Sequence, residues 1–140
     1  MKPSASVLLL AGAPVLLAGC VQDTASYMID GDRNHSIMVM RSQDLPWGDV
    51  SLAVTAARQP DCLGGLDIKG VPRNAELVLH QAPPDYAEPI YILTVGKDDY
   101  AVSTQSCRVQ KFAQAPADAG PEIGRFKEVD GTLEYVAAAK

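Results

Sequence analysis

Histidine and methionine are the residues of this sequence that could bind a soft metal ion. His35, Met38 and Met40 lie close together, and imidazole and thioether groups are both ligands of copper. On an extended strand, however, His35 points to one face while Met38 and Met40 point to the other. Methionine is also a common filler of protein cores. We therefore expect no bound metal and no cofactor, and keep a periplasmic copper-binding protein as an alternative.

Hydrolytic chemistry needs a nucleophile beside a base, or two carboxylates held at a fixed separation. The sequence has two histidines and contains neither a G-x-S-x-G elbow nor a glycine-rich phosphate loop. Its adjacent acids, Asp98 and Asp99, fall in an expected hairpin turn, where charged side chains are usually exposed to solvent and have no catalytic role. We expect a protein that is not an enzyme.

The N-terminal residues have the features of an export signal. Lys2 supplies a positive charge, and residues 7–17 form a mainly apolar run. A helix of this length measures about 16 Å, which is about half of the hydrocarbon core of a bilayer. We therefore expect residues 1–19 to be a cleaved signal peptide.

Four residues mark the end of this segment: Leu17, Ala18, Gly19 and Cys20. They resemble the lipobox of bacterial lipoproteins, in which small residues precede the cleaved bond and the cysteine thiol accepts a diacylglyceryl group. The resemblance implies that Cys20 carries acyl chains such as palmitate, and two or three chains anchor a protein durably to a membrane. Because Val rather than Asp follows Cys20, the same resemblance indicates the outer membrane, with the protein facing the periplasm.

Cys62 and Cys107 are the cysteines left once Cys20 is acylated. In an oxidising compartment such a pair is expected to form a disulfide bond. The bond would close a loop of 45 positions and stabilise the fold by about 4 kcal/mol. Neither cysteine has the CxxC spacing or the neighbouring histidines of a reactive or metal-binding thiol.

Length, composition and charge narrow the class of protein. The 140 residues are enough for one domain, and 47% hydrophobic with 21% charged residues is typical of a globular chain. The formal charge is −5, and it becomes −6 if Lys2 is removed with the signal peptide. Because the sequence has no dense basic cluster, neither nucleic acid nor an anionic membrane surface is an expected partner.

Short apolar runs separated by turn residues predict a mainly β domain over residues 35–112. We expect a small antiparallel sandwich or barrel of about five to six strands with one disulfide. The strands are expected at residues 35–42, 50–58, 75–81 and 90–95, with a fifth that begins at Tyr100.

The remaining segments carry weaker patterns. Residues 20–34 are expected to be a lipidated tether, residues 66–68 a short piece within a loop, and residues 113–140 a loose C-terminal tail. In an unbroken strand, Cys107 would point to the opposite face from Tyr100 and so away from the core. Either a bulge therefore intervenes, or the disulfide lies outside the core.

Trp47, between Pro46 and Gly48, is the single tryptophan. We expect it to cover one end of the core, and the alternative is an exposed anchor for a protein partner, since tryptophan is enriched at binding hot spots. For Tyr86, in a proline-rich connection, the same two alternatives apply: a side chain that covers the core, or an exposed anchor for a protein partner.

These features favour a lipid-anchored, non-catalytic protein of the cell envelope that binds or positions a protein partner in the periplasm through loops and an edge strand. An alternative is an inhibitor of a periplasmic hydrolase. In size, β-rich build and disulfide the chain is similar to the lipid-anchored lysozyme inhibitors of Gram-negative bacteria, and the loop of that family that ends in tyrosine is matched by Gly96 and Tyr100.

Overall fold

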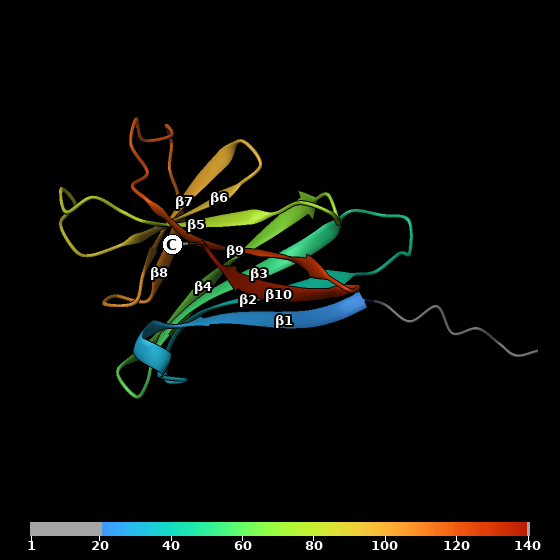
Figure 1. Cartoon of the computed structure of the whole chain (residues 1–140), viewed down its shortest axis with the longest axis horizontal. Coiled ribbons are helices and arrows are strands. Elements are labelled where there is room, and N and C mark those ends of the chain that lie inside the picture. The colour runs from blue at the N-terminus through green and yellow to red at the C-terminus, as the bar shows by residue number, and fades with distance from the viewer. Residues whose placement is uncertain (1–20, 140) are drawn as a thin grey trace, which may run out of the picture.

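The computed structural model describes residues 21–139, which form two antiparallel sheets (Figure 1). The four-stranded sheet has the order β1 (Val21–Met28), β2 (His35–Gln43), β3 (Val50–Arg58) and β4 (Cys62–Val71), with the short 3-10 turn η1 (Ile29–Gly31) after β1. The six-stranded sheet has the order β10 (Thr132–Ala137), β9 (Glu122–Val129), β5 (Leu77–Gln81), β6 (Tyr91–Val95), β7 (Asp98–Ser103) and β8 (Arg108–Lys111). The predicted mainly β, antiparallel fold with one disulfide is confirmed, with ten strands in these residues rather than five or six.

Alternating side chains from both sheets meet in one apolar core. On β3, Leu52 and Val54 point inward and are buried, whereas the alternate residues Ala53 and Thr55 are partly exposed. From the other sheet, Leu79, Leu93 and Phe126 are fully buried in the same cluster. Each sheet therefore covers the apolar face of the other.

The two sheets meet along two seams. At the first, β1 lies beside β10, and the rings of Tyr27 and Tyr135 are 5.0 Å apart between centroids. At the second, β4 lies beside β8, and a disulfide joins Cys62, the first residue of β4, to Cys107, the residue before β8, with 5.8 Å between the Cα atoms. Gly64 allows this approach, because a Cβ atom there would overlap the carbonyl oxygen of Cys107.

The expectation that residues 20–34 form a tether is wrong for the residues that the structure describes. From Val21 onward the chain is strand β1 followed by η1, and β1 pairs with β2 along its whole length. Its inward-facing residues include Ala25, which is buried, and Tyr27, which packs against the core. Because Asp23 occupies one of the inward-facing positions, the apolar alternation of this segment is too short to be recognised as a strand.

The loose tail expected at residues 113–140 is also wrong. β9 and β10 form a hairpin that pairs with β5 and buries Phe126 and Leu133. Asp130 and Gly131 make its two-residue turn with φ angles of 52° and 84°, which are values that Asp-Gly turns favour.

A turn at residues 104–107, rather than a bulge, decides which way the Cys107 side chain points. β7 ends at Ser103, the chain reverses, and Cys107 adopts a φ of 55°. Cys107 is thereby 5% exposed and belongs to the core, and the partly buried Cys62 packs against it, so the bridge lies at the edge of the core rather than outside it. Residues 66–68, expected within a loop, belong instead to β4.

The expected signal peptide at residues 1–19 and the lipobox cysteine Cys20 lie outside the described residues. In the part of the chain that the structure covers, no helix is long and apolar enough to cross a membrane.

Candidate functional site

The second seam opens into a groove beyond the disulfide. β4 forms one side from Leu66 to Val71, and the β6–β7 turn together with Lys111 forms the other. The groove has a volume of about 650 Å³. It lies toward the end of the fold at which β4 ends and β7 begins.

The floor of the groove is apolar and receives side chains from both sheets. Ile68 comes from β4, Val95 from β6 and Tyr100 from β7, and each is less than 10% exposed. Burial raises the pKa of the Tyr100 hydroxyl above its usual value of 10, a change that Asp98 reinforces and Lys111 opposes. Tyr100 therefore stays neutral in the floor at physiological pH.

Positive charge gathers on the rim. Three lysines line the groove, out of four in the described residues, and we call them the groove lysines: Lys69, Lys97 and Lys111. Lys111 Nζ lies 3.4 Å from Asp98 Oδ2, and all three lysines are exposed. Asp67 and Asp98 line the same groove, so three lysines face two aspartates and the rim has an excess of one positive charge, which favours a negatively charged group.

The two strands that flank the groove are sheet edges. β4 ends the four-stranded sheet and β8 ends the six-stranded sheet, so no strand of the described chain pairs with their outer sides. Alternate residues of such a strand direct backbone N–H and C=O groups away from the sheet. The groove therefore combines backbone hydrogen-bonding groups, an apolar floor and cationic side chains.

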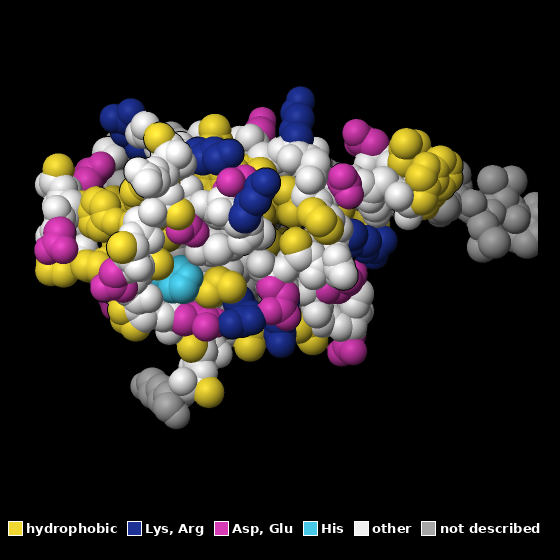
Figure 2. Space-filling model, turned by 90° about the horizontal axis from the view of Figure 1, so that it is seen from above, with side chains coloured by type: hydrophobic (Ala, Val, Ile, Leu, Met, Phe, Trp, Pro, Cys, Tyr) yellow, Lys and Arg dark blue, Asp and Glu magenta, His cyan; other side chains and the backbone are white. Residues whose placement is uncertain are grey.

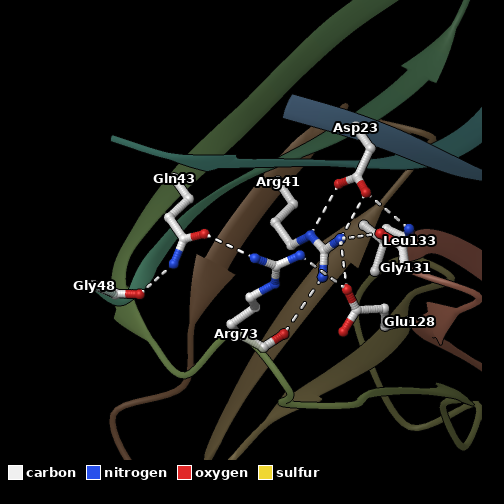
Figure 3. A network of polar contacts seen from close by, with 8 residues as sticks. All are labelled: Asp23, Arg41, Gln43, Gly48, Arg73, Glu128, Gly131 and Leu133. Carbon is white, nitrogen blue, oxygen red and sulfur yellow. Dashed lines mark hydrogen bonds and ion pairs between the residues drawn. The ribbon is translucent and has the colours of Figure 1, made fainter. Parts of the chain in front are cut away.

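A buried polar network lies at the same end of the four-stranded sheet (Figure 3). Arg41 is 2% exposed, and its Nε and Nη2 atoms donate hydrogen bonds to the two carboxylate oxygens of Asp23 at 2.9 and 2.6 Å. Glu128 lies 3.6 Å from the same guanidinium group. Burial raises the pKa of Asp23, but hydrogen bonds from Arg41 and from the Leu133 N–H lower it more, so the pKa falls below 3.8.

The network continues to the β2–β3 connection. Arg73 donates to Gln43 Oε1 at 3.2 Å and contacts Glu128 at 3.3 Å. Gln43 Nε2 in turn donates to the carbonyl oxygen of Gly48 at 2.5 Å, as Figure 3 shows. We call residues 44–49 the Trp47 loop. Because the charged groups are engaged with one another, the network positions this loop and offers no free acid or base.

Trp47 does not cover the core, and that expectation is wrong. Its side chain is 81% exposed, and Leu45 in the same loop is 53% exposed. Tyr86 lies in the β5–β6 connection at the opposite end of the molecule, where its ring packs against Phe112 with 6.2 Å between centroids (Figure 1). The structure therefore does not bring Trp47 and Tyr86 into one binding surface.

The remaining candidates are also separated. On β2, His35 is on the face of the buried Ile37 and contacts Thr104 Oγ1 at 2.7 Å, whereas Met40 is exposed on the other face. Among residues 21–139, no three His, Cys, Asp or Glu side chains form a group that could hold a metal ion. Tyr100 does not project from the β6–β7 turn, since it is 5% exposed in the groove floor.

Sequence reasoning missed the groove because its lysines come from three separate strands or turns. The available signal was weak: Lys69 precedes Gly70 and Lys97 follows Gly96, and both glycines have a positive φ angle. Comparison of the chain with protein families, curated proteins and solved structures found no match.

Proposed function

We propose that this chain is a non-catalytic lipoprotein of the bacterial envelope, held in the outer membrane by acyl chains on Cys20 and facing the periplasm. We further propose that its groove binds an extended, carboxylate-bearing segment of a protein partner. The observation that supports the second proposal is the groove, which has three lysines around an apolar cleft between two unpaired strand edges.

An extended segment would add a strand to the edge of β4. The backbone of β4 would provide hydrogen bonds, as in other cases of strand addition to a sheet edge. Every second side chain of the segment would face the floor formed by Ile68 and Val95, and carboxylates would meet Lys69 and Lys97 at the rim. Such a ligand uses each property of the groove at once.

The resemblance of Leu17 to Cys20 to a lipobox supports the anchored location. Cys20, the residue that would be acylated, immediately precedes β1 in the sequence. The Cys62–Cys107 disulfide is a bond that persists in oxidising compartments outside the cytosol. Mass spectrometry of protein purified from the envelope tests the anchor, with an N-terminus at acylated Cys20 as the expected result and an unmodified Met1 terminus as the contrary one.

Titration with a defined peptide tests the groove. A synthetic peptide of alternating valine and glutamate, added to isotopically labelled protein, is expected to shift the amide resonances of residues 66–71 and 96–98. A peptide with glutamine in place of glutamate should bind more weakly, because it cannot pair with the groove lysines.

Two matched variants locate the effect. Changing all three groove lysines to glutamate should abolish the shifts, whereas an equal charge change elsewhere should preserve them. The control carries Arg33→Glu, Arg108→Glu and Lys127→Glu, at residues that do not line the groove. Shifts spread over the whole surface, or unchanged in the groove variant, would contradict the proposal.

A further inference from the structure

We infer that the Trp47 loop is a second membrane contact: it inserts Leu45 and Trp47 into the interface of the same phospholipid bilayer that holds Cys20. This inference rests on the proposed acylation of Cys20. It adds a contact made by the folded domain itself, and it fixes which end of the domain faces the lipid.

The pairing of β1 with β2 brings the loop to the anchor. Val21, the residue after Cys20, lies opposite Gln43, and the Trp47 loop begins at the next residue, Asp44. Opposed residues in an antiparallel pair have Cα atoms about 5 Å apart, and consecutive residues about 3.8 Å apart. The root of the loop at Asp44 is therefore within about 13 Å of Cys20, the residue expected to be acylated. Figure 1 shows the loop extending past the end of the sheet at which β1 begins.

The loop presents an apolar tip. Leu45, Pro46 and Trp47 are consecutive and exposed, and Trp47 has the largest exposed fraction of the large hydrophobic residues in the described chain. Figure 2 shows hydrophobic side chains projecting at this end, while apolar and charged side chains are interspersed over the rest of that face. Tryptophan favours the boundary between headgroups and acyl chains, since its ring is apolar and its N–H can stay hydrogen-bonded.

The reach of the loop is sufficient. Trp47 is four residues beyond Gln43, a distance of at most about 14 Å along an extended chain. The headgroup layer on one side of a bilayer is about 5 to 8 Å thick. A domain whose first strand starts directly after the anchor can therefore place this ring at the acyl boundary.

The loop is held in shape before it meets a membrane. The Gly48 carbonyl accepts the hydrogen bond from Gln43, and the Gly48 N–H donates to the Leu45 carbonyl at 3.2 Å. Gln43 is 2% exposed and is itself held by Arg73. Little conformational freedom is then lost on insertion, which favours binding.

The charged residues beside the tip indicate which lipid headgroups favour insertion of the loop. Asp44 and Asp49 flank the apolar tip, and both are exposed. Carboxylates at this position disfavour close approach to anionic headgroups, so the contact depends on apolar burial and zwitterionic lipid is sufficient.

Because Trp47 is the single tryptophan, its fluorescence reports on the loop alone. The acylated protein from the envelope is reconstituted into vesicles of phosphatidylcholine with brominated acyl chains, which quench a ring only at short range. Trp47 should lose most of its emission relative to plain phosphatidylcholine vesicles, and its spectrum should shift to the blue. A control with Trp47→Phe and Leu63→Trp moves the reporter to another exposed apolar site, at the disulfide end, where the emission should be unaffected.

The outcomes separate the two proposals. Protein that is acylated and floats with the vesicles, but whose Trp47 is not quenched, overturns the loop contact and leaves the anchor intact. Quenching at Leu63→Trp as strong as at Trp47 also overturns it, because the orientation would then be wrong. Quenching that requires added phosphatidylglycerol would assign the contact to basic side chains instead of the loop. Protein that lacks acyl chains overturns both proposals.

Discussion

Replacing Asp23 by asparagine tests whether the buried network holds the two sheets together. The substitution keeps the size of the side chain and an oxygen that accepts a hydrogen bond, but it removes the negative charge opposite Arg41. Arg41 comes from β2 and is 2% exposed, while the Asp23 side chain is 15% exposed. The arginine would then keep Glu128, at 3.6 Å, as its remaining carboxylate contact within the described residues.

The expected cost follows from this geometry. Breaking a buried ion pair by removing one partner usually costs about 3 to 5 kcal/mol, because the other charge stays buried. The partial exposure of Asp23 and the contact with Glu128 reduce the figure for Asp23→Asn to about 2 to 3 kcal/mol. In a domain of this size the melting temperature would fall by about 10 °C.

Urea unfolding followed by circular dichroism measures the change as a lower midpoint at constant slope. Glu122→Gln is the matched control, since it breaks a surface pair with Arg125 in which both side chains are 34% exposed. Exposed pairs contribute little to stability, so the control midpoint should not move. If Asp23→Asn lowers the midpoint no more than this control, the network does not stabilise the fold as reasoned.

The same residue predicts a pH dependence. Because the pKa of Asp23 is lower in the folded protein than its ordinary 3.8, the unfolded chain binds the proton first as the pH falls. The contribution of Asp23 to stability is therefore present above pH ~4 and is lost as the pH drops through the folded-state pKa. Asp23→Asn should remove this part of the acid dependence, and an unchanged acid profile would count against the assignment.

Three further results are expected. Cys62→Ser with Cys107→Ser should lower the free energy of unfolding by about 4 kcal/mol, measured by urea titration, since the bridge closes a loop of 45 positions. Spectrophotometric titration should show Tyr91 and Tyr135 ionising only near pH 12, because burial raises the pKa of each to about 12, and stability should fall above pH ~10, where the unfolded chain loses these protons first. Gly64→Ala should cost about 1 to 3 kcal/mol in the same urea assay, because its methyl group overlaps the Cys107 carbonyl oxygen.

Strands with a regular apolar alternation were predictable from the sequence. β3 coincides with the predicted residues 50–58, and β2 and β6 lie within one residue of the prediction at each end. In each of these strands aliphatic residues recur on the core face, although on β2 this face ends in the buried polar residues Arg41 and Gln43. The disulfide was predictable for the same kind of reason, because two cysteines of an exported chain have few alternatives.

β1 was not predictable because one of its core-facing residues is Asp23. An aspartate breaks an apolar alternation, and its burial is favourable because Arg41 on the adjacent strand and the Leu133 N–H on β10 both donate hydrogen bonds to it. β4 was missed because Gly64 and Gly65 are typical of a loop. In the folded protein they permit close contact, Gly64 with Cys107 and Gly65 with the backbone of Val54, which a sequence pattern does not show.

The roles proposed for the loop and the groove depend on the same buried network. Arg41 and Gln43 are on one strand, so the ion pair that joins β2 to β1 also fixes the residue that holds Gly48 in the Trp47 loop. Arg73, which holds Gln43, follows the end of β4 and so lies close in sequence to the groove wall at Val71. A loss of Asp23 should therefore loosen the loop before it unfolds the domain. Hydrogen exchange in Asp23→Asn should be faster at Gly48 than in the wild type, with the disulfide end of β4 unchanged, and equal protection at Gly48 would show that the loop holds its shape without the network.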